Sequence, residues 1–179
     1  MRNTEFSPCR KYRYTLWREF YSAQAINPPL LPVEGNRAHN YAMFIGLNPS
    51  TADETQDDPT IRRCIGFAKS WGYGALCMTN LFAWRDTLPE NMKRASDPVG
   101  PRNDEWLLDC AKGAGVIVAA WGKHGAFMNR AHNLLKLIPN VMALRLNDDG
   151  SPAHPLYLPK TSQPFAMNNE NSPLTPTEP

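Results

Sequence analysis

The chain has 179 residues, of which 42% are hydrophobic and 20% charged, and its formal net charge is +2 at pH 7. This composition predicts one soluble globular domain, and the small net charge does not by itself indicate nucleic-acid binding. No apolar run reaches the roughly 18 to 20 residues that a membrane span needs, and residues 1–5 lack the apolar core of a signal peptide.

The four cysteines, at positions 9, 64, 77 and 110, show no C-x-x-C spacing and no paired histidines. A zinc site is therefore not expected. Scattered cysteines on apolar stretches are typical of free thiols in a reducing compartment, so we expect a cytoplasmic protein without a metal or cofactor.

Apolar patterning, together with prolines and glycines, predicts the first strands and loops of the chain. Residues 1–9 are expected to form a loose N-terminal arm. Over residues 12–17, aromatic or apolar residues alternate with polar ones, which predicts a strand. Prolines and a glycine mark residues 23–40 as a loop. The apolar run 41–47 predicts a buried strand, which Pro49 ends because it lacks an N–H.

A helix is expected from Pro59 to about Trp71. Asp58 can accept hydrogen bonds from the free N–H groups of its first turn, Pro59 suits the first helical position, and Gly72 ends it. Residues 75–81 predict a second core strand.

The second half of the chain continues the alternation after a polar excursion. Helices are expected over residues 103–112 and 126–137, and strands over 115–120 and 141–144. The pattern predicts a three-layer α/β/α domain over residues 10–166, with a central, mostly parallel four-stranded sheet. The polar, proline-rich residues 167–179 are expected to be a disordered tail.

Polar or aromatic turns follow all four predicted core strands, at Asn48, Asn80, Trp121 and His154. The carboxyl ends of parallel strands lie at one edge of a sheet, where ligands bind in open α/β folds. We therefore expect these turns to converge on one crevice. The alternative for each is an ordinary turn or cap that only ends a strand.

Three segments of the chain form a recognisable set: Gly46-Leu47-Asn48-Pro49, Thr79-Asn80-Leu81 and His154-Pro155-Leu156-Tyr157-Leu158. The set resembles the uracil-DNA glycosylase superfamily, which has a Gly-x-Asn/Asp/Ala-Pro motif, a base-reading Asn and a late His-Pro loop. Over residues 10–165 the chain is also similar to a family of bacterial and phage domains of unknown function. That similarity rests on Leu-Asn-Pro-Ser-Thr-Ala-Asp, Asp-Pro-Thr-Ile-Arg-Arg, Asn-Leu-Phe-Ala and His-Pro-Leu-Tyr.

The resemblance implies catalytic roles for Asn48 and His154. Asn48 would hold the attacking water or contact the base, and His154 would donate a hydrogen bond to the leaving base. An amide is no strong general base, so Asp53, Asp57 or Asp58 is a candidate for the missing carboxylate, and the alternative for each is a turn or helix-cap residue.

The resemblance also implies a base pocket and a DNA-contacting surface. Asn80 would read the base edge, with Leu47 and Phe82 beside it, although Phe82 is equally well explained as a core residue. The remaining candidates contact DNA, four through phosphates and the last two as a wedge in the duplex: Ser50, Thr51, Arg62, Lys160, Tyr157 and Leu158.

We therefore expect a monomeric DNA glycosylase that flips a modified base out of DNA and leaves an abasic site. The bacterial and phage character of the similar family favours a hypermodified phage pyrimidine and antiviral defence. Two alternatives stay open: a non-catalytic nucleic-acid or nucleotide-binding module, and an enzyme that acts on free nucleosides or nucleotides.

Overall fold

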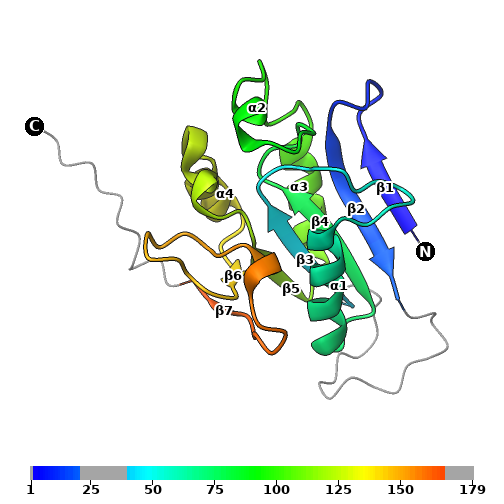
Figure 1. Ribbon diagram of the computed structural model, residues 1–179, viewed down its shortest axis with the longest axis vertical. Coiled ribbons are helices and arrows are strands. Elements are labelled where there is room, and N and C mark those ends of the chain that lie inside the picture. Colours follow the sequence, from blue (N-terminus) through cyan, green and yellow to red (C-terminus); the bar gives the residue numbers. More distant parts are fainter. Residues whose placement is uncertain (1, 21–39, 168–179) are drawn as a thin grey trace, which may run out of the picture.

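A seven-stranded mixed sheet runs through the centre of the computed structural model, which describes residues 2–20 and 40–167 (Figure 1). Its strand order is β1-β2-β4-β3-β5-β6-β7. The strands are β1 (Arg2–Phe6), β2 (Arg13–Glu19), β3 (Tyr41–Gly46), β4 (Ala75–Asn80), β5 (Val116–Ala119), β6 (Met142–Ala143) and β7 (Phe165–Ala166).

The strands expected from the four apolar runs form a continuous parallel block within this sheet. β3 pairs in parallel with both β4 and β5, and β5 pairs in parallel with β6. The prediction of a four-stranded sheet is nevertheless wrong in extent, because β1, β2 and β7 extend it with antiparallel pairs. The fold is thus mixed α/β.

The N-terminal arm is also corrected, because residues 2–6 form a strand. β1 pairs antiparallel with β2, from Arg2 opposite Arg18 to Phe6 opposite Arg13. Polar residues on this edge strand hide the apolar alternation that identifies a strand in the sequence. Of the predicted tail, Met167 packs against the core and residues 168–179 lie outside the described residues.

Helices cover both faces of the sheet. They are α1 (Pro59–Ser70), α2 (Pro89–Lys93), α3 (Asn103–Lys112) and α4 (Arg130–Leu137), with 3-10 turns η1 (Lys123–Asn129) and η2 (Pro155–Tyr157). The predicted start of α1 is confirmed: the Asp58 side chain accepts a hydrogen bond from the Ile61 N–H at 2.8 Å.

Helix α4 begins four residues later than the sequence predicts. Met128 and Asn129 adopt positive φ values of 54°, which interrupt a right-handed helix, and the preceding turn is 3-10. Arg130 then starts α4 with its side chain buried against the turn after β4.

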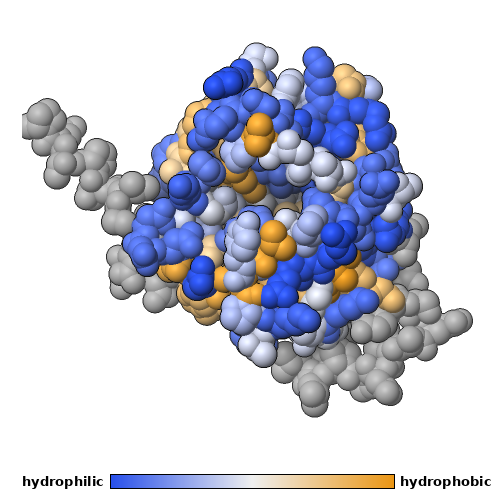
Figure 2. Space-filling model, in the orientation of Figure 1, coloured by the Kyte–Doolittle hydropathy of each residue, from blue (hydrophilic) through white to orange (hydrophobic). Residues whose placement is uncertain are grey.

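Successive side chains of β3 pack into two separate hydrophobic cores, one on each face of the sheet, as expected for a strand buried on both faces. Ala42 and Phe44 pack with α1, whereas Met43 and Ile45 pack with α2, α3 and α4. No helix in the described part of the chain is long and apolar enough to cross a membrane. The face in Figure 2 is largely hydrophilic, with separate hydrophobic spots.

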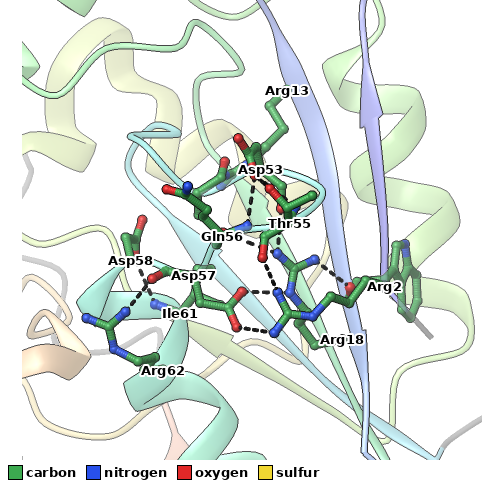
Figure 3. Close-up of polar contacts among 12 residues, drawn as sticks. Arg2, Arg13, Arg18, Asp53, Thr55, Gln56, Asp57, Asp58, Ile61 and Arg62 are labelled. Carbon is green, nitrogen blue, oxygen red and sulfur yellow. Dashed lines mark hydrogen bonds and ion pairs between the residues drawn. The ribbon is translucent and has the colours of Figure 1, made fainter.

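Two arginines of the β1–β2 hairpin hold the loop between β3 and α1 against the sheet (Figure 3). Arg18 Nε lies 2.7 Å from Asp57 Oδ1, and these side chains are only 3% and 11% exposed. Arg18 also donates to the Asp53 carbonyl, and Arg2 donates to the Thr55 carbonyl and to Asp57. These contacts fix the path of the loop from Asp53 to Asp57, directly before the cap of α1.

We predict that Arg18→Met lowers the free energy of unfolding by about 3 kcal/mol, because the buried Asp57 carboxylate loses its buried cation and keeps only the half-exposed Arg2. Arg102→Met is the matched control: its ion pair with Glu105 is exposed, and its loss should cost less than about 1 kcal/mol. Urea unfolding of both variants measures the difference. Equal losses would show that the loop does not depend on the buried pair.

Candidate functional site

The parallel register places the polar residues after β3 and β4 at neighbouring strand ends. Gly46 lies opposite Asn80 in the pairing of these strands, and Asn48 follows two residues after Gly46. The segment that leads to His154 reaches the same edge, because the Gly122 N–H after β5 donates to the Pro152 carbonyl at 3.0 Å. The structure thus brings the three predicted segments to one edge of the sheet.

The Asn48 side chain is fixed in orientation by two backbone carbonyls. Its amide nitrogen donates to Asp86 O at 2.7 Å and to Pro49 O at 3.2 Å. Because both partners only accept hydrogen bonds, the amide NH2 group must face them. The carbonyl oxygen of Asn48 is left without a partner among the described residues, and it can accept a hydrogen bond from water.

The Asn80 side chain is buried and unsatisfied. It is 1% exposed, and neither its oxygen nor its nitrogen has a hydrogen-bond partner in the described part of the chain. An unpaired buried amide costs about 1 to 3 kcal/mol, so Asn80 does not contribute a side-chain hydrogen bond to the stability of the described fold. Gly46 makes room for it, since a Cβ there would lie 2.8 Å from Asn80 Oδ1.

Two residues that the sequence did not single out hold the backbone at Asn80. Asn103, at the start of α3, donates to the carbonyls of Asn80 and Leu81 at 3.0 and 2.9 Å. Arg130 donates to the Leu81 carbonyl and pairs with Asp104. No motif signals these roles, because they arise only when the starts of α3 and α4 meet the end of β4.

His154 precedes η2 and is half-buried. Its Nδ1 accepts a hydrogen bond from the Leu156 N–H at 3.4 Å, which leaves the ring proton on Nε2. Burial lowers the pKa of His154, and the nearby Asp58 carboxylate opposes this shift. The neutral imidazole can therefore donate one hydrogen bond from Nε2 without carrying a charge.

The candidate carboxylate Asp53 is a turn residue. Its Oδ1 accepts hydrogen bonds from the N–H groups of Thr55 and Gln56 and from the Thr55 hydroxyl. These donors, the backbone N–H groups first, lower the pKa of Asp53 to about 2. A carboxylate so stabilised is a poor proton acceptor. Asp53 is therefore a turn residue that caps the backbone N–H groups of its own loop, and its expected role as a general base is corrected.

Three further candidates are core residues instead of ligand contacts. Phe82 is fully buried and packs against Phe127, Leu158 is 2% exposed, and Trp121 is 3% exposed beneath Gly125. Phe82 is thus the core residue of its alternative, and the wedge role of the buried Leu158 is wrong for this structure. Leu47 is partly buried against the core on the side of α3, and its contact with a base stays a prediction.

The other DNA-contact candidates lie at the surface. Tyr157 is 78% exposed next to His154. Ser50 and Thr51 line a cavity of about 420 Å³, which Asn48, Asn80 and His154 do not line. Arg62 is exposed and donates to the Asp57 carbonyl, and Lys160 is exposed. Within residues 2–20 and 40–167, no three His, Cys, Asp or Glu side chains cluster as metal ligands would.

Comparison with known families matches residues 13–156 to the model described as "Protein of unknown function (DUF1643)". The match covers most of the chain, from β2 to the turn that contains His154. No curated protein and no solved structure matches the chain.

We predict that Gly46→Ala destabilises the protein by about 1 to 3 kcal/mol, as overpacking of a filled core does. The new Cβ would lie 2.7 Å from Met78 Cε and 2.8 Å from Asn80 Oδ1. Gly66→Ala on α1 is the control, because nothing lies within 4 Å of its Cβ, and it should be neutral or stabilising by about 1 kcal/mol. Urea unfolding measures both. A neutral Gly46→Ala would mean that Asn80 has room to move.

His154 should make the stability of the protein depend on pH. Because its pKa is lowered in the folded state, the unfolded state binds the proton first as pH falls below the ordinary value of 6.5. The contribution of neutral His154 to the free energy of unfolding is complete above pH 6.5. It is lost progressively as the pH falls from 6.5 to the lower pKa of the folded state. The free energy of unfolding should therefore fall less between pH 7.5 and pH 5.5 in His154→Asn, which keeps a capping oxygen but cannot titrate, than in wild type. Identical pH profiles would contradict the assignment.

Proposed function

The chain belongs to the family of unknown function that matches residues 13–156, and we propose that it is a DNA glycosylase. It would hydrolyse the N-glycosidic bond of a base flipped out of DNA and leave an abasic site. The motif resemblance to uracil-DNA glycosylases, with their three-layer fold, supports this proposal. The expected setting is the bacterial cytoplasm, and the expected substrate is a modified base of phage DNA.

The observation that carries the proposal is the unpaired amide of Asn80. Its oxygen and nitrogen offer one acceptor and two donors at the carboxyl edge of the parallel strands. A nucleobase edge presents complementary donors and acceptors side by side, so one bound base would satisfy both ends of the amide. Enzymes that act on bases read the flipped base through such hydrogen bonds.

Asn48 and His154 supply the chemistry in this proposal. The free carbonyl oxygen of Asn48 would accept a hydrogen bond from a water and hold it for attack on C1′ of the sugar. As the bond from C1′ to the base breaks, its electrons stay on the base, and the Nε2–H of neutral His154 would stabilise the anion. The water loses its proton to solvent, and the base takes one up. Tyr157, exposed beside His154, would take the wedge role that the buried Leu158 does not fill.

One observation favours the second candidate, a nucleic-acid-binding module without catalysis. Asp53, the carboxylate proposed to activate water, is held in a turn with its pKa lowered to about 2. A site without a general base can bind an extruded base and yet hydrolyse nothing. If the protein binds modified DNA but releases no base, it is a binding module and not a glycosylase.

The glycosylase proposal predicts release of free base from duplexes that contain uracil, mismatches or phage-modified pyrimidines, with alkali-labile sites left behind. Removing one stabilising donor or a water-positioning group costs about 10²- to 10³-fold in rate. Asn48→Ala and His154→Asn should each lose about that much. Mass spectrometry of the released bases measures the rates and identifies the base. Absence of release from every substrate would reject the enzyme.

Asn80→Ala separates a functional amide from a structural one. It removes an unpaired buried group, so we expect lost base release with a free energy of unfolding within about 1 kcal/mol of wild type. Asn103→Ala is the matched control, because it removes two hydrogen bonds to buried carbonyls and should cost about 2 to 3 kcal/mol. If Asn80→Ala is the more destabilising of the two, the amide has a structural role and the proposal loses its main support.

A further inference from the structure

The cavity of about 420 Å³ lies between three loops that backbone hydrogen bonds join into a preformed wall. The turn between β1 and β2 meets the loop after β4, because the Arg85 N–H donates to Lys11 O at 2.9 Å and Tyr12 bridges to Trp84. The loop after β3 joins them through the Asp86 N–H, which donates to Pro49 O at 3.0 Å. The cavity therefore exists before any ligand binds.

Positive charge dominates the lining of this cavity. Arg10, Lys11 and Arg85 contribute cations, and Asp86 is the acidic residue among the lining residues. Arg10 is paired with Glu54 at 2.8 Å. Lys11 lies over the Trp84 ring and Arg85 over the Phe6 ring, and neither has a carboxylate partner within the described ranges. The Asp86 carboxylate is engaged by the Leu88 N–H and the Asn91 amide. About two positive charges are thus available to a ligand.

Two further details concern the arginines of the lining: Arg85 keeps an unused donor, and Arg10 is held in a strained turn. Arg85 Nε is buried and has no hydrogen-bond partner in residues 2–20 and 40–167, although an arginine normally uses its donors when buried. Arg10 adopts a positive φ of 56°, a conformation that costs a residue with a Cβ about 1 kcal/mol and that clusters at ligand sites. Both residues line the same cavity.

The other lining groups suit a nucleotide strand. Ser50, Thr51 and Thr87 offer hydroxyl groups to phosphate oxygens. The Trp84 ring packs against the core and Tyr12 on one side and adds aromatic surface to the cavity lining beside Lys11. A phosphodiester carries one negative charge per nucleotide, which matches two free cations better than a triphosphate does. A carboxylate peptide would satisfy the cations but would leave the flat ring of Trp84 unused.

We propose that this cavity binds the phosphodiester backbone of the DNA strand next to the flipped base, with Lys11 and Arg85 as its principal contacts. The inference rests on the proposed function for its choice of DNA. The link between the two sites is direct: Asn48 donates to the carbonyl of Asp86, which lines the cavity.

The test uses the full chain and a short fluorescent oligodeoxythymidylate that contains no modified base, so that binding is measured without any base release. Each lost phosphate contact should reduce the slope of log affinity against log salt by about 0.7. Lys11→Gln and Arg85→Gln should each show this reduction and bind several-fold more weakly. The control is Lys136→Gln, an exposed cation of α4 outside the cavity, which should bind as wild type does.

Three outcomes would overturn the inference. The first is wild-type affinity and salt slope in both cavity variants. The second is an equal loss in Lys136→Gln, which would show only general attraction by the surface charge. The third is competition by thymidine monophosphate or inorganic phosphate at the same concentration as the oligonucleotide, which would identify a free-phosphate site. Oligonucleotide binding through Lys11 and Arg85, together with no base release from any of the uracil, mismatch and phage-modified duplexes, would instead uphold the cavity and reject the glycosylase.

Discussion

The buried ion pair between Arg18 and Asp57 is the interaction on which the candidate site depends. Desolvation makes such a pair expensive unless each partner is also hydrogen bonded, and Arg18 meets that condition through the carbonyls of Trp17 and Asp53. The geometry is directional, because a guanidinium has planar donors that fit only one arrangement of acceptors. The pair thus selects one path for the loop from β3 to α1, and that path carries Asn48 and the Asp58 cap.

A second feature shows that stability alone did not select the residues at this edge. Asn103 and Arg130 saturate the carbonyls of the turn at Asn80 and Leu81, yet nothing in the described residues meets the Asn80 side chain. An apolar residue there would avoid the cost of an unpaired amide. Natural proteins break such local rules chiefly at functional sites. Hydrogen bonds from Asn103 and Arg130 thus fix the backbone at Asn80 and Leu81, while the buried Asn80 amide gains no hydrogen bond from the described residues.

The parallel core could be predicted from the sequence because each of its strands is a short apolar run bounded by proline, glycine or asparagine. Such a pattern is complete within a few consecutive residues. The helix cap at Asp58 could also be predicted, because it depends only on Asp58 and the next three residues. Features that depend on tertiary pairing could not be predicted. β1 is a strand only because β2 offers a free edge, and Tyr157 rather than Leu158 is exposed because η2 turns the chain. The cavity cations come from segments about 75 residues apart, which meet only when Tyr12 bridges to Trp84.

The two sites at this edge share a structural element, so their occupancy should be coupled. Asp86 contributes its carbonyl to Asn48 and its N–H to Pro49, and it also lines the cavity. A strand held in the cavity would favour the loop arrangement in which the Asn48 carbonyl oxygen points away from these partners and toward a ligand. Linkage is reciprocal, so a base bound at Asn80 would in turn strengthen binding of the strand. Under the proposed function, the neutral groups of Asn48, Asn80 and His154 would discriminate between bases, and the charged cavity would supply affinity that does not depend on sequence.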